Sequence, residues 1–187
     1  MAWGLGLGII IDGNLYYGKS GFSGELGHFC MFENEVLCHC GKKGCLETEA
    51  SGSAFHRILM ERYREGSNTI LAGKLDSGEE ISLGDLLEAV RKEDVLCIDI
   101  LEKMGVNLGK GIAGLMNIFN PELVILGGTL SLAGEYISLP IKSAIRKYSL
   151  NLVNQDTEIK ISKLGERAGA FGACLLSRSK LLGMIHY

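Results

Sequence analysis

The sequence contains no apolar run long enough to cross a membrane as a helix, which takes about 20 residues. Its longest apolar runs, such as 123–126, have the length of a strand. Residues 1–11 are also apolar, but no basic region precedes them and glycine interrupts them. They predict a strand and not a signal peptide, so no membrane partner is expected.

An excess of positive charge is missing as well. Lysine and arginine total 19 against 22 aspartates and glutamates, which gives a formal net charge of −3. A domain that binds nucleic acid through its own surface usually carries a basic face, so we expect DNA to be contacted only through another, N-terminal domain. Hydrophobic residues make up 47% of the chain, an ordinary globular composition, and the length predicts one domain over 1–187.

The cysteines lack the even spacing of a small disulfide scaffold. Three of them crowd into 38–45, and the others stand singly in apolar stretches, at Cys30, Cys97 and Cys174. This pattern predicts a reducing, cytoplasmic environment, one metal cluster, and three buried cysteines that bind nothing.

Periodicity and turn signals predict an α/β domain in which helices cover a mixed sheet. Asp12-Gly13 is a strong hairpin signal. The expected strands are 3–11, 14–18, 29–32, a fully buried 123–126, and 158–162. The expected helices are 48–64, 83–91, 94–117, 134–149 and 168–182, with an exposed, irregular excursion at 65–82. Glycines in the helix at 94–117 lower helix stability, so we infer close packing against another backbone there.

The segment 38–45 has the spacing C-x-C-x4-C, and His28 lies upstream of it. Thiolate and imidazole are ligands that zinc prefers, and structural sites take four of them. Gly41 and Gly44 would let the backbone turn back on itself. His28 and His39 are rival fourth ligands, and His28 is favoured because a residue between two ligating cysteines tends to point away. Four protein ligands leave no position for a catalytic water, which predicts a structural zinc.

These residues resemble the hallmark stretch of the ROK family (repressors, open reading frames and kinases). The resemblance runs from Gly24-Glu25-Leu26-Gly27-His28 through Cys38-x-Cys40-Gly41-x-x-Gly44-Cys45-x-Glu47 to Ser51. The opening Gly4-x-Gly6-x-Gly8, the stretch from Asn120-Pro121 to Gly127-Gly128, and Gly169-Ala170-Phe171-Gly172-Ala173 are also similar to family segments. The likeness therefore covers nearly the whole chain.

The resemblance implies an actin-like, hexokinase-like (ribonuclease H-like) fold, of which this chain covers the C-terminal lobe. It implies metal ligation by His28, Cys38, Cys40 and Cys45, within a zinc and sugar subregion at about 19–52. It implies sugar contacts from Glu25, His28 and Glu47, since carboxylates accept hydrogen bonds from hydroxyl groups. It also implies a nucleotide side near Gly4, Gly6, Gly8, Gly127 and Gly128, and a homo-oligomer, dimer or tetramer.

A complete kinase would need further parts. The family's catalytic aspartate lies in an N-terminal lobe, and neither that segment nor the first phosphate-binding loop occurs in 1–187. Trp3 stands where family kinases usually place a small hydroxyl residue, and a bulky ring there would reshape a phosphate cradle.

The leading hypothesis is therefore the sugar-sensing, oligomerising lobe of a transcriptional regulator. The alternative is the C-terminal half of an ATP- and Mg²⁺-dependent sugar kinase of the glucokinase or N-acetylhexosamine kinase type. A third hypothesis is a zinc-stabilised interaction module whose sugar site has decayed.

Overall fold

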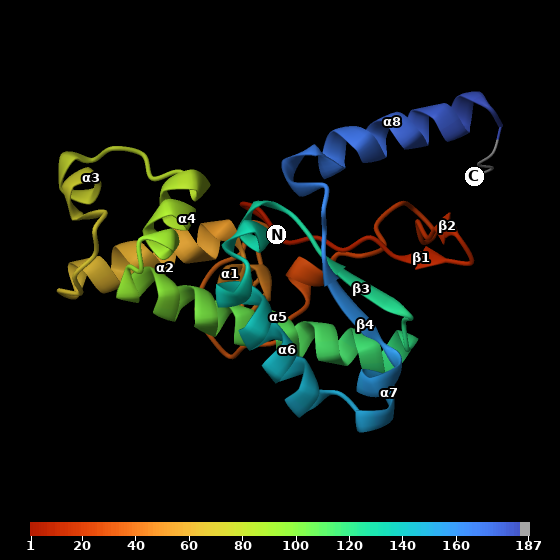
Figure 1. Ribbon diagram of the computed structural model, residues 1–187, viewed down its shortest axis with the longest axis horizontal. Coiled ribbons are helices and arrows are strands. Elements are labelled where there is room, and N and C mark those ends of the chain that lie inside the picture. The colour runs from red at the N-terminus through yellow and green to blue at the C-terminus, as the bar shows by residue number, and fades with distance from the viewer. Residues whose placement is uncertain (184–187) are drawn as a thin grey trace.

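The computed structural model describes residues 1–183 (Figure 1). The strands are β1 (Ile10–Ile11), β2 (Asn14–Leu15), β3 (Leu123–Leu126) and β4 (Glu158–Ile161). The helices are α1 (Glu47–Ala50), α2 (Gly52–Arg64), α3 (Ala72–Ser77), α4 (Leu83–Arg91), α5 (Val95–Phe119), α6 (Glu135–Tyr148), α7 (Asn151–Asp156) and α8 (Ala168–Leu181). Among these residues, none of the helices combines the length and apolarity that a bilayer span requires.

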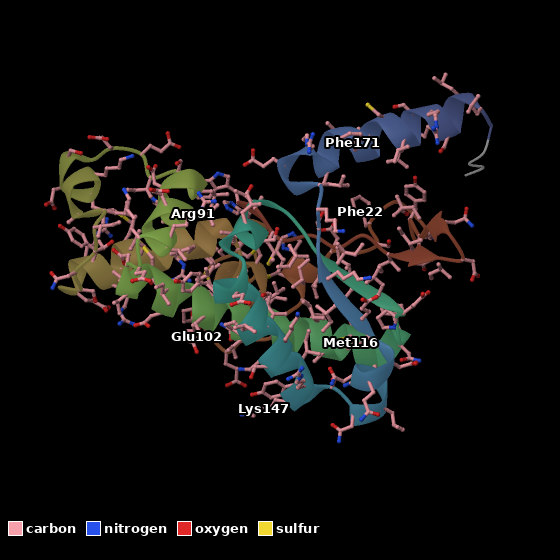
Figure 2. All side chains as sticks on the ribbon, viewed as in Figure 1. Phe22, Arg91, Glu102, Met116, Lys147 and Phe171 are labelled. Atoms are coloured by element: carbon pink, nitrogen blue, oxygen red, sulfur yellow. The ribbon has the colours of Figure 1, made fainter. Side chains whose placement is uncertain are left out.

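The long helix α5 is the centre of the core, with α6 along one side and α1, α2 and α4 against other parts of its surface. Asp94 begins α5 by accepting a hydrogen bond from the backbone N–H of Cys97, as an N-cap residue does. Asn120 ends it in the left-handed conformation, with φ of 42°. Met116, labelled in Figure 2, is fully buried near its end.

The glycines of α5 allow α6 to approach closely. A Cβ on Gly109 would lie 2.6 Å from both the Ala144 side chain and the Ile141 carbonyl oxygen, and one on Gly105 would lie 2.8 Å from Pro140. The predicted close packing is confirmed, and its partner is a helix of the same chain. These glycines therefore give no support to an oligomer.

Both directions of strand pairing occur, so the predicted mixed α/β class is confirmed, although the strands form two separate pairs. β1 pairs with β2 in antiparallel fashion, and β3 pairs with β4 in parallel through a crossover that contains α6 and α7. The expectation that 123–126 is fully buried was wrong. Leu126 is buried, but Leu123 and Ile125 are 40% and 61% exposed, because no described element covers the face they share.

Other elements differ from the bounds that the sequence predicts, and the two expected strands are shorter because they lack hydrogen-bond partners. Of the strand expected at 3–11, only Ile10–Ile11 pairs, and the glycine-rich first part makes isolated contacts such as Leu7 N–H to the Gly24 carbonyl. The strand expected at 29–32 is reduced to a single bridge. The excursion at 65–82 contains α3, and the helix expected at 48–64 is broken at Ser51, whose side chain caps α2.

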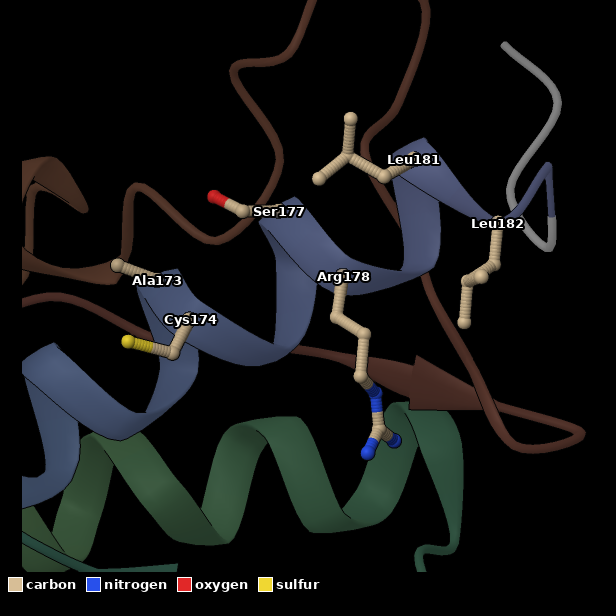
Figure 3. A pocket seen from close by; sticks show the side chains of 6 residues that line it. All are labelled: Ala173, Cys174, Ser177, Arg178, Leu181 and Leu182. Carbon is tan, nitrogen blue, oxygen red and sulfur yellow. The ribbon is translucent and has the colours of Figure 1, made fainter.

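The last helix, α8, stands apart from the helical core (Figure 1). Each of its residues remains at least partly exposed. Phe171 on α8 and Phe22, which follows the hairpin, are 51% and 77% exposed (Figure 2). A hollow of about 500 Å³ runs along α8, between residues 173 and 182 (Figure 3). None of its lining residues belongs to the site that the sequence predicts.

Candidate metal centre and adjoining acidic residues

Residues 28–46, here called the cysteine knuckle, fold back on themselves through two short antiparallel bridges. Cys30 pairs with Cys45, and Leu37 pairs with Lys43. Gly41 and Gly44 make the turns, with φ of 84° and 77°, a region that side chains disfavour. A Cβ on Gly44 would lie 2.1 Å from the Phe32 carbonyl oxygen, so only glycine fits at that crossing.

The knuckle brings together the four residues that the sequence predicts as metal ligands. The ligand atoms of His28, Cys38, Cys40 and Cys45 all lie within 4.8 Å of one another. Cys38 Sγ is 3.5 Å from His28 Nδ1, and Cys40 Sγ is 3.6 Å from Cys45 Sγ. A tetrahedral zinc with bonds of about 2.3 Å separates its sulfurs by roughly 3.8 Å. The cluster therefore has the spacing to bind a metal ion such as zinc.

His39 lies outside this cluster. The group of possible ligand atoms includes Cys38 and Cys40 on either side of it but not His39, which is exposed. The structure thus brings the more distant histidine, His28, to the cysteines.

The surroundings of the cluster shift the pKa values of two of its thiols in opposite directions. Burial, followed by the nearby sulfurs of Cys40 and Cys38, raises the pKa of Cys45 to about 12. A hydrogen bond from the Lys42 backbone N–H is the main cause that lowers the pKa of Cys40. A metal ion would supply the positive charge that a thiolate at Cys45 lacks, since coordination deprotonates thiols.

His28 has a second neighbour on its other ring nitrogen. Nδ1 faces Cys38, and Nε2 lies 3.7 Å from Glu25 Oε2. A 3₁₀ turn at Leu26–His28 brings Glu25 and His28 to the same side, three residues apart. The Glu25 side chain is 59% exposed, so its carboxylate can still accept hydrogen bonds from outside the chain.

Glu47 is the first residue of α1 and lies beside the same turn. Its Oε2 accepts a hydrogen bond of 2.8 Å from the Leu5 backbone N–H. The same oxygen is 3.3 Å from the position of a Cβ on Gly27, the residue before His28. Glu47 thus links the glycine-rich opening segment to the turn that carries the imidazole.

Arg57, which connects the parts of the corner between α1 and α2, was missed in the sequence. Its guanidinium donates to the Thr48 carbonyl at 2.8 Å and to both oxygens of Glu61, and it lies 3.6 Å from Glu49. Asn34 of the knuckle donates to the same Glu49 carboxylate at 2.8 Å. The one local signal was the Arg57 to Glu61 spacing of four residues, which any exposed helix pair shows.

A hollow of about 130 Å³ lies between residues 36–39 of the knuckle and the α1–α2 corner. Glu47 and Arg57 both line it. Arg57 therefore contacts the same corner of the structure that carries Glu47.

The glycines predicted for the nucleotide side fall into two groups. Gly4, Gly6 and Gly8 are in the opening segment, and no atom lies within 4 Å of a Cβ on Gly6 or Gly8. Gly127 and Gly128 follow β3, and Gly128 has φ of 85°. Met1, at the start of the opening segment, contacts this turn, and its amino group donates to the Gly127 carbonyl at 2.7 Å.

The expectation of three buried single cysteines was wrong for two of them. Cys97 is fully buried in α5, but Cys30 and Cys174 are exposed. An apolar neighbourhood in the sequence predicts burial only where another element covers that face. α8, which carries Cys174, has no such cover among residues 1–183.

The fold and this cluster define a class: a mixed α/β lobe in which a His/Cys cluster that could bind a metal ion lies beside carboxylates. The profile of the ROK family matches residues 1–180. The chain belongs to the ROK family.

Relatives with two different activities resemble the chain. A glucokinase of Halalkalibacterium halodurans is 36% identical over 90% of this chain and 52% of its own length. A xylose repressor of Caldicellulosiruptor bescii is 33% identical over 98% of this chain and 46% of its own. The structure of a ROK glucokinase from Streptomyces griseus, solved with glucose and AMPPNP, matches with a TM-score of 0.84 and 31% identity, over 96% of this chain and 59% of that one.

The chain thus spans about half the length of the relatives it matches. Kinases and repressors match at nearly equal identity, so the expected greater closeness to the regulators does not follow from these comparisons.

Proposed function

We propose that this chain is the sugar-binding lobe of a ROK protein and that a zinc ion held by His28, Cys38, Cys40 and Cys45 fixes its binding surface. One observation carries the proposal: the two nitrogens of His28 face different partners, Nδ1 the cysteines and Nε2 the carboxylate of Glu25. A single imidazole can then belong to a metal centre and to a polar binding surface at once.

The chemistry of such a surface suits a neutral polyol. A metal on Nδ1 would leave the proton of the neutral ring on Nε2, and that N–H can donate to a hydroxyl oxygen. The carboxylates of Glu25 and Glu47 accept hydrogen bonds from hydroxyl groups, and such charge-assisted bonds are stronger than neutral ones. The same two negative charges would oppose an anionic group at this end of the ligand.

We further propose that the protein is a regulator whose DNA contact is made outside residues 1–187. Trp3 supports this interpretation. Its ring packs edge-on against His56 of α2, with centroids 6.2 Å apart, and it is 45% exposed beside Gly4. The opening segment is tied to α2 by hydrogen bonds from Gly52 N–H to Ala2 and from Ser53 N–H to Trp3. A bulky side chain is thus held in the segment that would otherwise approach a phosphate.

In a regulator, sugar binding would shift the population of lobe or subunit arrangements and so change affinity for DNA. Assembly into a dimer or tetramer is part of this proposal. It rests on the family resemblance, because the α5 glycines are occupied by α6. A strictly monomeric full-length protein in solution scattering would contradict it.

The second candidate is half of an ATP- and Mg²⁺-dependent sugar kinase, and the likeness to glucokinases favours it. The full-length protein decides between the two. A regulator binds an operator fragment with an affinity that a sugar changes, and it does not consume ATP. ATP-dependent phosphorylation of a sugar would establish the kinase instead.

Sugar binding itself is tested by calorimetric titration of a panel of hexoses, pentoses and N-acetylhexosamines. Glu47→Gln should weaken the best ligand about tenfold or more, because it removes a charged acceptor. Glu33→Gln, an exposed acid of the same knuckle, is the matched control and should change little. If no sugar binds although zinc is present, the lobe is a zinc-stabilised interaction module.

A further inference from the structure

Cys30 lies directly opposite Cys45, one of the four cluster residues, in the antiparallel bridge of the knuckle. The two hydrogen bonds that define the bridge flank the pair: Leu46 N–H donates to Phe29 at 2.9 Å, and Met31 N–H donates to Gly44 at 2.8 Å. Cys30 and Cys45 themselves exchange no backbone hydrogen bond. They therefore form a pair of the non-hydrogen-bonded type.

In pairs of this type the Cα atoms are roughly 4.5 Å apart and the two side chains share one face of the ladder. A disulfide needs Cα atoms about 4.4–6.8 Å apart, with Cβ atoms directed toward each other. The backbone around Cys30 and Cys45 therefore meets the distance requirement of a disulfide.

The two thiols differ in access. Cys45 is fully buried and its sulfur belongs to the ligand cluster, whereas Cys30 is exposed and outside the cluster. The contact found for Cys30 Sγ is a weak one, 3.7 Å from the Lys43 carbonyl oxygen. Oxidation of cysteine follows exposure, so of the two paired thiols an oxidant reaches Cys30 before Cys45.

We infer that Cys30 is a peroxide-reactive thiol that forms a disulfide with Cys45 and thereby removes a sulfur from the metal centre. The inference rests on the proposed metal centre for its consequence, but the disulfide itself does not require the metal.

The chemistry takes two displacements. The Cys30 thiolate attacks one oxygen of hydrogen peroxide, so an S–O bond forms, the O–O bond breaks and hydroxide leaves. The Cys45 sulfur then attacks the Cys30 sulfur, so an S–S bond forms, the S–O bond breaks and a second hydroxide leaves. The two sulfurs lose two electrons in total, and peroxide is reduced to two hydroxides. A sulfur in a disulfide is no longer a thiolate ligand, and three protein ligands remain.

The test exposes zinc-loaded protein to hydrogen peroxide and follows released zinc with a chromogenic chelator. Peptide mass spectrometry after alkylation identifies the disulfides formed. In the unchanged protein we expect a Cys30–Cys45 disulfide that appears together with zinc release and is reversed by dithiothreitol. Cys30→Ser should slow zinc release about fivefold or more, because the accessible thiol is gone.

Serine suits this site because its hydroxyl can replace the contact with the Lys43 carbonyl and the side chain is exposed, so the fold should be kept. Cys174→Ser removes an exposed cysteine that lies outside the knuckle, on α8, and should behave like the unchanged protein. Equal rates of release with and without Cys30, or disulfides only among Cys38, Cys40 and Cys45, would overturn the inference.

Zinc content is measured before peroxide is added, which separates the two proposals. Protein that holds no zinc contradicts the metal centre, while the Cys30–Cys45 disulfide is still scored by mass spectrometry. Protein that holds zinc but forms no such disulfide contradicts the inference alone.

Discussion

The sulfur of Cys40 lies 3.6 Å from that of Cys45, so its removal breaks the proposed coordination set. Cys40→Ser should release zinc and lower the free energy of unfolding by about 3 kcal/mol or more, because a structural metal contributes directly to folding. Metal analysis and thermal unfolding, each with and without a chelator, measure the effect. Cys174→Ser is the control on an exposed helix. A Cys40→Ser protein with a full zinc content would exclude this ligand set.

Arg57 connects three parts of the site corner at one guanidinium, and the prediction for it is structural. Arg57→Ala removes the hydrogen bond to the Thr48 carbonyl and the ion pair with Glu49, so α1 should loosen and the free energy of unfolding should fall by about 1–2 kcal/mol. Sugar affinity should fall as well, because α1 carries Glu47. Arg62→Ala, in the last turn of the same helix, is the comparison. Identical unfolding and titration curves for the two variants would contradict this role.

At the residue scale, the cysteine spacing was enough to predict the cluster, since several thiols crowded into one short loop are typical of a metal site. The position of Glu47 beside Gly27 could not be predicted, nor could the contacts by which Arg57 joins α1 to α2. Both depend on contacts between segments distant in the sequence, which no local pattern encodes. Exposure of Cys30 was missed for the same reason.

At the scale of the elements, the close packing of α5 against α6 can be tested with two glycine substitutions in α5, of which one serves as the control. Gly109→Ala places a Cβ 2.6 Å from Ala144 and should destabilise the protein by about 1–3 kcal/mol through overpacking. Gly114→Ala meets nothing within 4 Å and should stabilise by up to about 1 kcal/mol, since alanine favours a helix more than glycine does. Chemical denaturation measures both. A stabilising Gly109→Ala would show that α6 does not pack as described.

The contact between α3 and α4 makes a prediction about pH. The Lys74 ammonium lies 2.6 Å from Asp85, and this hydrogen bond, with those from Ser82, lowers the pKa of Asp85 to about 2 from 3.8. A carboxylate with a lowered pKa stabilises the fold above its ordinary pKa, and the contribution is lost as pH falls from about 4 toward 2. Solvent screening keeps the effect small, because both side chains are partly exposed.

Lys74→Gln should therefore be less stable than the unchanged protein above pH 4, and the difference should shrink toward pH 2. Urea denaturation across this range measures it, with the exposed Lys103→Gln as control. A difference that is constant with pH would assign the effect of Lys74 to packing instead of charge.

The sequence predicted elements well where their signals are local. The helix at 83–91 has its expected bounds because Ser82 and Asp85 form a capping box. The strand at 123–126 was also placed correctly. The opening segment failed because apolar and glycine residues alone do not supply a neighbouring strand, and strands need partners from elsewhere in the chain.

At the scale of the whole molecule, metal and sugar should act on each other through His28. By thermodynamic reciprocity, a sugar that binds more tightly to zinc-loaded protein must also raise the affinity for zinc. We expect a bound sugar to slow zinc loss to a chelator and to raise the unfolding temperature only when zinc is present. Competition kinetics and thermal melts check this. A thermal shift of the same size after complete chelation would separate the two sites.

Because α8 is isolated, we expect it to unfold locally before the other long helices do. A helix of this length without tertiary packing is marginal in water, whereas the buried turns of α5 open only with the whole fold. In hydrogen–deuterium exchange the amides of 168–181 should exchange first and those of 96–113 last. A partner that binds α8 would slow the exchange of the amides in that helix alone.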